Sequence, residues 1–174
     1  MTPDHMIFNA HENCVITWKG FKYQCALGKQ GVISADKKRE GDNKSPIGHW
    51  PMRRVFYRPD RVSCPETELE TVAIKNDMGW SDDAKDTKNY NKLVALPYSF
   101  SHEKLWRDDH VYDIVVELGY NDDPPIAGKG SAIFMHVKRN DYEGTEGCVA
   151  LDINHLKQLL KDAKPGDVVS IGSS

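Results

Sequence analysis

The chain has 174 residues, 28% of them charged, with a formal net charge of −3 at pH 7. Lys and Arg are interspersed with acids rather than clustered, which excludes a nucleic-acid surface, and no apolar run is long enough to span a bilayer. The length is ordinary for one domain, so we expect residues 1–174 to form a single domain. The N-terminal Met-Thr-Pro-Asp-His lacks the basic and apolar regions of a signal peptide. The chain is therefore either cytoplasmic or begins after a removed leader.

Two short strands are predicted around Cys14 and Cys25. The apolar runs Cys-Val-Ile-Thr-Trp and Tyr-Gln-Cys-Ala-Leu are joined across a Lys-Gly pair, which is typical of a tight hairpin. The four cysteines show no CxxC pair and no metal-ligand spacing, so we expect no metal site. We expect Cys14 and Cys25 to pack in the core, with a disulfide between them as the alternative in an oxidising compartment.

Residues 38–48, KREGDNKSPIG, bring Gly, Asp, Asn and Pro together and predict a surface loop. The loop lacks the Lys-Ser/Thr ending of a phosphate-binding loop. Four arginines follow it, interleaved with apolar residues: Arg53, Arg54, Arg58 and Arg61. They indicate either a solvated strand edge or a cationic wall that meets the carboxylates of a peptide.

Residues 64–91 are polar and turn-rich, and we expect a long irregular stretch that flanks a substrate groove. A short strand is predicted at 93–98, broken by Pro97, and a clearer one at 111–119. A turn at 120–125 ends that second strand.

The stretch 131–137, SAIFMHV, predicts a buried strand on which His136 shares a face with Phe134 and Ala132. A polar loop then leads to Cys148, and a helix follows with Asp152 as its N-cap. Pro-Gly stops this helix after residue 164, and a last strand is expected at 167–171. A short loop thus brings one His and one Cys close together.

His136 and Cys148 are the residue types of a thiol nucleophile with a general base. A free thiol has a pKa of about 8.5, and a neighbouring imidazole can take its proton. Gly147 leaves room for a substrate backbone, and the N–H groups of Gly147 and Cys148 can face a developing oxyanion. The alternative is a buried structural cysteine near a core histidine, because Cys is among the most buried residue types.

This arrangement resembles the catalytic signature of the L,D-transpeptidases, a family of bacterial cell-wall enzymes. Their signature is a strand that ends in His, a variable loop, and Ser/Thr-His-Gly-Cys followed by a small apolar stretch. Here it reads His136, then Thr-Glu-Gly-Cys at 145–148. The loop at 38–48 is similar to the family's second signature, Lys/Arg-x-Gly-Asp-x-x-Thr/Ser-Pro-x-Gly.

The chain departs from the family pattern at two places. Glu146 stands where the family has a His, and Ala150 stands where it has Arg or Asn. The sequence resembles the divergent subgroup whose motif is His…Thr-Glu-Gly-Cys. The upstream His is the base in the family, so the departure at Glu146 bears on substrate choice rather than on the base.

The resemblance implies a mainly β fold, a sandwich of mixed sheets with one or two helices. It implies a cysteine-dependent L,D-transpeptidase without cofactor or metal, acylated by carbapenem β-lactams and located in the periplasm or cell envelope. Cys148 attacks the amide between an L-centre and a D-amino acid of a peptidoglycan stem peptide. An amine of another stem peptide resolves the thioester. His136 is the base, oriented by the carbonyl of Val137, and Gly147 belongs to the catalytic loop. We expect a monomer. The residues expected to contact substrate are Thr145, Glu146, Tyr120, Asn121, Tyr98 and Trp106.

Three alternatives stay open at this point. An L,D-carboxypeptidase, or a transpeptidase that makes an unusual cross-link, would resolve the same thioester with water or with an amine at another stem position. A thiol hydrolase of small amides would have no connection with the wall. A catalytically idle domain would only bind peptidoglycan.

Overall fold

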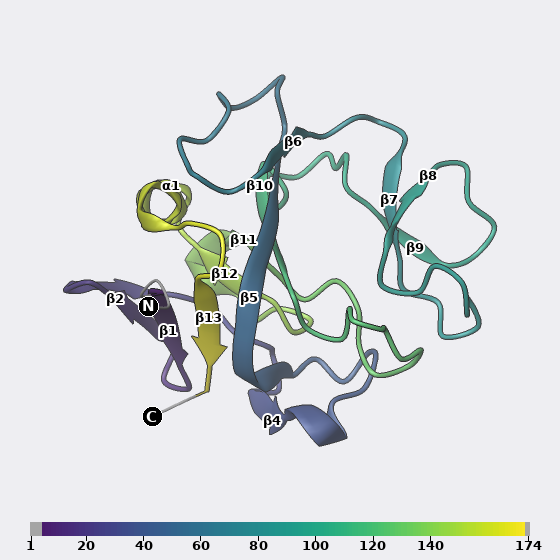
Figure 1. The fold of residues 1–174 in the computed structure, drawn as a ribbon, viewed down its shortest axis with the longest axis horizontal. Helices are drawn as coiled ribbons and strands as arrows, with labels where there is room; N and C mark the ends of the chain where they lie inside the picture. The colour runs from purple at the N-terminus through teal and green to yellow at the C-terminus, as the bar shows by residue number, and fades with distance from the viewer. Residues whose placement is uncertain (1–4, 173–174) are drawn as a thin grey trace.

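The computed structural model describes residues 5–172 (Figure 1), and the N-terminal residues 1–4, on which the expected absence of a signal peptide partly rests, lie outside them. The described chain is mainly β with one α-helix, as predicted. Its strands are β1 (Ile7–His11), β2 (Val15–Trp18), β3 (Phe21–Gln24), β4 (Val32–Ser34), β5 (Ser45–Tyr57), β6 (Thr71–Ala73), β7 (Met78–Ser81), β8 (Leu93–Ala95), β9 (His102–Lys104), β10 (Ile114–Leu118), β11 (Phe134–Val137), β12 (Val149–Leu151) and β13 (Val168–Ile171). The helix α1 spans Ile153–Asp162, and two 3-10 turns are η1 (Ala35–Lys37) and η2 (Asn140–Tyr142).

A mixed sheet runs in the order β12-β11-β10-β5-β13-β1-β2-β3, with β4 and β6 also paired to β5. The 13-residue strand β5 is its axis. Its first half pairs antiparallel with β13 and its second half with β10. The pairs β1–β13 and β11–β12 are parallel. One long strand therefore joins the two halves of the sheet, and β11 and β12 lie at the end of one half.

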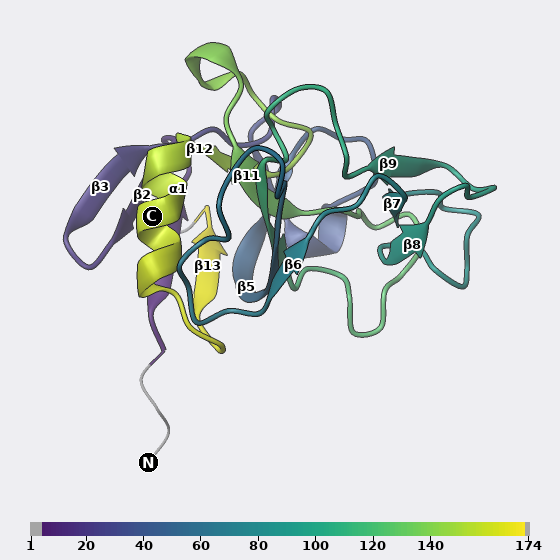
Figure 2. The ribbon, with the colours of Figure 1, turned by 90° about the horizontal axis from the view of Figure 1, so that it is seen from above.

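Helix α1 lies against the sheet (Figure 2), and Leu156, Leu159 and Leu160 are fully buried on one of its faces. Their spacing is that of an amphipathic helix. Asp152 is the N-cap, as predicted: its Oδ1 accepts the N–H of Asn154 over 2.8 Å. The helix ends at Asp162, ahead of the Pro-Gly pair. This helix closes the main core, to which both halves of the sheet contribute.

A second, three-stranded sheet in the order β8-β7-β9 lies at the right of Figure 1, away from α1. Trp80 of β7 fixes it to the main sheet, because its ring packs edge-on against Phe134 with centroids 5.0 Å apart. The indole N–H of Trp80 donates to Asn91 Oδ1 over 2.9 Å.

The stretch 64–91, predicted to be irregular throughout, contains the strands β6 and β7. β6 pairs with β5, and β7 pairs with β8 and β9, and the polar composition of the stretch does not reveal this pairing.

The hairpin of β2 and β3 is confirmed. Lys19 and Gly20 both have positive φ, 47° and 84°, as a tight two-residue turn requires. Cys14 and Cys25 flank the hairpin as free thiols, and Cys25 is buried, as expected of core packing.

The arginine-rich run forms the second half of β5 and the turn after it, and β5 is an inner strand rather than an edge. Each arginine has an acidic partner within the protein: Arg53 with Asp122, Arg54 with Glu117, Arg58 with Asp60, and Arg61 with Asp113. Both interpretations from sequence, the solvated edge and the cationic substrate wall, were therefore wrong. The acidic partners come mostly from distant parts of the chain, which the sequence pattern does not reveal.

Several predicted strands are shorter than expected. The strand predicted at 131–137 begins only at Phe134, because Gly130 and Ala132 have positive φ, 110° and 54°, and bend the chain. β10 and β8 likewise cover only parts of 111–119 and 93–98. The short strand β12 also stands between Cys148 and the helix, so Cys148 ends a loop that leads into a strand rather than into a helix.

Candidate active site

The parallel pairing of β11 and β12 brings His136 and Cys148 onto one face of the sheet. Met135 pairs with Val149 and His136 with Ala150, so Cys148, one residue before β12, lies beside Phe134. Phe134 and His136 are two residues apart and therefore point to the same face. The two candidate catalytic side chains are diagonal neighbours across two strands, a relationship within reach of long side chains.

Cys148 is 7% exposed and its thiol is held by the backbone of the preceding strand and loop. Sγ donates to the carbonyl oxygen of Ala132 over 3.2 Å and accepts the N–H of Phe134 over 3.3 Å. Burial raises the pKa of this thiol to about 12, although the Phe134 N–H opposes the shift. The thiol of Cys148 is therefore protonated at neutral pH.

His136 is held by the main chain of the next residue, as predicted. Its Nδ1 lies 2.9 Å from the carbonyl oxygen of Val137. A carbonyl only accepts, so Nδ1 carries the proton and Nε2 has the free lone pair that a general base needs. The Tyr112 ring packs edge-on against the imidazole, with centroids 5.6 Å apart. Burial lowers the pKa of His136 to about 4, so the ring is neutral at pH 7.

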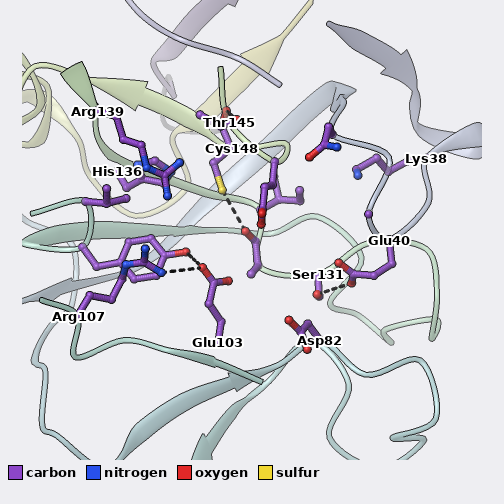
Figure 3. Close-up of a pocket in the computed structure, with 17 residues that line it drawn as sticks. Lys38, Glu40, Asp82, Glu103, Arg107, Ser131, His136, Arg139, Thr145 and Cys148 are labelled. Atoms are coloured by element: carbon purple, nitrogen blue, oxygen red, sulfur yellow. Dashed lines mark hydrogen bonds and ion pairs between the residues drawn. The ribbon is translucent and has the colours of Figure 1, made fainter. Parts of the chain in front are cut away.

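Both residues line one cavity of about 270 Å³ between β11 and the three-stranded sheet (Figure 3). Among residues 5–172 no hydrogen bond joins His136 to Cys148, because the thiol points to Ala132. A rotation of the S–H group away from Ala132 is therefore needed before His136 can take its proton.

The loop before Cys148 is fixed by Thr145, which is buried. Its Oγ1 donates to the carbonyl of Cys148 over 2.7 Å and accepts the N–H of Gly147 over 3.1 Å. Gly147 has φ +141°, and a Cβ there would lie 2.9 Å from the carbonyl oxygen of Lys44. The close approach of the loop at Lys44 therefore requires glycine here, and the approach of a substrate backbone to Gly147 stays a prediction. Because Thr145 accepts the Gly147 N–H, this group is not free to bind an oxyanion in this conformation.

The loop at 38–48 forms the other side of the cavity. Lys38 is buried, and its Nζ contacts Asp42 Oδ1 over 2.5 Å. Asp42 also accepts the main-chain N–H groups of Arg39 and Lys44, over 3.0 and 2.9 Å. The turn-forming residues of this loop thus build a closed network whose Lys44 carbonyl touches Gly147.

The wall opposite Cys148 comes from β9 and the segment after it. Glu103 of β9 accepts the hydroxyl proton of Tyr112, and Arg107 Nη1 lies 3.9 Å from its Oε1. Burial raises the pKa of the Glu103 carboxyl to about 7, while the Tyr112 hydroxyl and Arg107 oppose this shift. Nearby acids, Glu146 and Asp82, raise this pKa further. The wall therefore holds an acid that titrates near neutral pH.

Comparison with known proteins decides the family. The YkuD family, the L,D-transpeptidase catalytic domain, matches residues 3–171. The chain belongs to the L,D-transpeptidase catalytic domain family. No curated protein sequence matches the chain.

Two solved structures are similar to this chain at low identity. The helical cell shape determining protein Pgp2 from Campylobacter jejuni is 17% identical, with a TM-score of 0.47, over 98% of this chain and 49% of that one. L,D-transpeptidase 1 from Mycobacterium tuberculosis is 11% identical, with a TM-score of 0.43, over 98% of this chain and 60% of that one. This chain therefore spans about half to three fifths of the length of these proteins.

Four residues of the L,D-transpeptidase motif line the cavity, namely His136, Thr145, Glu146 and Cys148, whereas Gly147 and four of the predicted substrate contacts are not among its lining residues. Tyr98 bonds to Asp86, and the ring of Trp106 lies under the guanidinium of Arg58, 3.7 Å away. Tyr120 is buried, and its hydroxyl donates to the carbonyl of Lys129 over 2.6 Å. Asn121 organises the loop that follows, since its Oδ1 accepts the N–H of Ile126 over 2.8 Å. Thr145 and Glu146 do line the cavity, with Glu146 exposed.

Sequence reasoning missed several lining residues of this L,D-transpeptidase cavity. They are charged or aromatic residues from four separate segments: Lys38, Glu40, Asp82, Glu103, Arg107, Tyr112 and Arg139. Three of them carried a local signal: Lys38 and Glu40 belong to the loop at 38–48, and Arg139 follows the strand of His136 within three residues. The others reach the cavity through long-range pairing of strands.

No group of three or more His, Cys, Asp or Glu residues within 5–172 is arranged to hold a metal ion. In the same residues, no helix is both long and apolar enough to cross a membrane. Several polar side chains of the cavity, among them Glu40, His136 and Thr145, are hydrogen-bonded to other side chains or to the main chain.

Proposed function

We propose that the protein is a peptidoglycan L,D-transpeptidase of the periplasm or cell envelope, with residues 1–174 as a single monomeric catalytic domain. The observation that carries this proposal is that His136, with its Nδ1 proton on the Val137 carbonyl, lines the same cavity as the Cys148 thiol. The base and the nucleophile come from neighbouring parallel strands. A structural cysteine would need no such cavity and no tautomer-fixed imidazole beside it.

The reaction begins when His136 Nε2 takes the thiol proton of Cys148. Sγ then attacks the carbonyl carbon of the amide between an L-centre and a D-amino acid of a stem peptide. The S–C bond forms and the C–N bond breaks, and His136 returns its proton to the leaving amine nitrogen. An amine of a second stem peptide attacks the thioester, loses a proton to His136, and releases the Cys148 thiol.

The tetrahedral intermediates carry negative charge on the former carbonyl oxygen, and donors aimed at this charge supply a large part of the catalysis in acyl transfer. The Gly147 N–H donates to Thr145 Oγ1, so we assign the main stabilisation of the oxyanion to the N–H of Cys148. Because Thr145 also bonds to the Cys148 carbonyl, the peptide plane after the nucleophile is fixed. A loop that is already held in this conformation needs little reorganisation during the reaction.

The same thioester also serves the alternative reaction, in which water resolves it and the enzyme is an L,D-carboxypeptidase. The carboxylates of Glu103 and Glu146 favour a cationic acceptor such as the ammonium group of a second stem peptide, and they offer nothing comparable to neutral water. This favours transpeptidation over hydrolysis.

The experiment is incubation of the protein with purified stem peptides, followed by mass spectrometry of the protein and the products. We expect a thioester on Cys148, loss of the terminal D-amino acid, and a cross-linked product. A carbapenem should form an adduct on the same residue. Cys148→Ala, with Cys14, Cys25 and Cys64 still present, should form neither adduct while keeping the fold. Trimmed peptides without cross-links would indicate the carboxypeptidase, and no adduct at all would indicate an idle domain.

A further inference from the structure

Arg139 differs from the other arginines of the described chain. Arg53, Arg54, Arg58, Arg61 and Arg107 each pair with a carboxylate, and Arg39 donates to main-chain carbonyls. Within residues 5–172, the guanidinium of Arg139 has neither a hydrogen bond nor an ion pair, yet Arg139 is only half-exposed and lines the cavity of Cys148.

Arg139 lies beside His136 at one end of the cavity (Figure 3). It follows the strand of His136 and precedes the turn η2, whose Tyr142 N–H donates to the Arg139 carbonyl over 3.2 Å. This contact fixes the main chain of Arg139 and leaves its side chain available. Its positive charge contributes to the lowered pKa of His136.

Arg107, the other arginine at this end, already pairs with acidic residues of the protein. Its Nε and Nη2 donate to both oxygens of Asp109 over 2.9 and 2.7 Å, and Nη1 lies 3.9 Å from Glu103. Ala150, which pairs with His136 across the strands, is buried and has no polar side chain. The charge of Arg139 also acts on Asp109, but both oxygens of that carboxylate already pair with Arg107. The cavity end near His136 thus contains one guanidinium without a hydrogen-bond partner among the described residues, which can bind an anion from outside the protein.

The proposed reaction itself brings an anion to this place. His136 protonates the amine nitrogen of the leaving amino acid. When that amino acid is the last of its peptide, its free carboxylate is attached to the same carbon atom as this nitrogen. The group that binds the carboxylate must therefore be an immediate neighbour of His136. A guanidinium suits this task because its parallel N–H groups match the two oxygens of a carboxylate.

We propose that Arg139 binds the free terminal carboxylate of the leaving amino acid and thereby restricts the enzyme to the last amide bond of its donor peptide. This inference rests on the proposed function and adds a specificity-determining residue to it. A donor whose last residue is amidated loses the charge, so it leaves Arg139 without a matching partner. Arg139 thus confines the acylation step of the proposed transpeptidation to the terminal amide bond of the donor and excludes internal amide bonds.

The test compares two donor stem peptides that differ only at the end, a free D-amino acid carboxylate or its primary amide. The readout is the single-turnover rate of acylation of Cys148, followed by mass spectrometry. We expect the wild type to acylate at least about tenfold faster with the free acid, the effect of one charge-assisted hydrogen-bonded pair. Arg139→Gln should lose this preference by slowing the free acid only, and Arg139→Lys should retain part of it.

Arg53→Gln is the matched control, since Arg53 is 41% exposed, pairs with Asp122 and does not line the cavity. It should keep the wild-type preference. Equal acylation of the wild type by both donors would overturn the inference while leaving the proposed function intact, and this comparison requires no variant to fold. An equal loss with both donors in Arg139→Gln would assign Arg139 a general structural role instead. No acyl-enzyme with either donor would refute the proposed function and this inference together.

Discussion

The Sγ of Cys148 donates its proton to the carbonyl oxygen of Ala132 over 3.2 Å, and Ala132 has a left-handed backbone conformation with φ +54°. The bend at Ala132 turns its carbonyl toward the thiol and ends the strand early. The nucleophile is therefore stored as a neutral, hydrogen-bonded thiol rather than as a thiolate. In the proposed reaction, substrate binding reorients the S–H group toward His136, so we expect the activated thiol only in the complex.

Because its thiol is neutral and hydrogen-bonded, Cys148 should be alkylated slowly when no substrate is bound. With iodoacetamide at pH 7, the exposed Cys64 should be labelled first and Cys148 at least about tenfold more slowly, because its pKa is raised to about 12 and only thiolates react. Peptide mapping by mass spectrometry measures both sites in one sample. Faster labelling of Cys148 than of Cys64 would contradict the assigned resting state. Slow alkylation alone therefore does not identify an idle domain.

Thr145 is predicted to stabilise the catalytic loop through both of its hydrogen bonds. Thr145→Val should lower the free energy of unfolding by about 1–3 kcal/mol, because it leaves the Cys148 carbonyl and the Gly147 N–H buried without partners. It should also slow acylation. Thr145→Ser keeps the hydroxyl and should remain near wild type in both respects. Urea unfolding and single-turnover acylation measure the two effects. A Val variant as stable and as active as the wild type would remove Thr145 from this role.

The parts of the fold that sequence predicts are those whose signal is local. The Lys-Gly turn of the first hairpin and the helix after Asp152 depend on a few adjacent residues, and both are found as predicted. The proximity of His136 and Cys148 was also predictable, because the chain segments that carry them are joined by one short loop. The predicted strand boundaries were wrong where the backbone bends, as at Ala132.

The rest of the cavity depends on contacts between distant segments. Glu103 belongs to a three-residue strand whose pairing with β7 gives no sign in its composition. In the sequence, Tyr112 is one residue of the predicted strand at 111–119, and only the structure shows that its hydroxyl donates to Glu103. The arginines of β5 and of the turn after it were misinterpreted for the same reason: their acidic partners are mostly far away in the sequence.

Glu103 is predicted to make stability depend on pH. Its pKa in the folded protein is about 7, above the ordinary 4.5, so the folded state binds more protons between these values. Its contribution is thus fully present below pH 4.5 and is lost as the pH rises through 7. Glu103→Gln still accepts the Tyr112 hydroxyl but cannot titrate, so it should gain stability relative to the wild type as the pH rises. The free energy of unfolding of the variant minus that of the wild type should be about 1–2 kcal/mol larger at pH 8 than at pH 4.5.

Thermal unfolding of both proteins from pH 4 to 8 measures this difference. Titration of His136 is common to wild type and variant and cancels in the comparison. The exposed Glu66, paired with Lys161 at 3.9 Å, supplies the control Glu66→Gln, which should show no such pH dependence. A difference between wild type and Glu103→Gln that is constant across this range would show that the carboxyl of Glu103 titrates normally.

The identity of the base is the prediction on which the mechanism depends. His136→Gln should lower the rate of acylation by roughly a hundredfold or more, because the variant has no group at Nε2 to accept the thiol proton. Glu146, exposed at the mouth of the cavity, should instead affect the choice of substrate. Glu146→Gln is therefore expected to acylate at a near-normal rate with its best donor and to change the relative rates among donors.

Single-turnover acylation of both variants across pH separates these roles. Because burial lowers the pKa of His136 to about 4, the imidazole is already neutral at pH 5, and wild-type acylation should decline only as the pH approaches 4 rather than near 6.5. A carboxylate base titrates in a similar range, so the profile alone does not identify the base. Normal acylation in His136→Gln together with its collapse in Glu146→Gln would transfer the role of base to Glu146. The opposite pattern is expected, since the Val137 carbonyl holds His136 in the tautomer that a base requires.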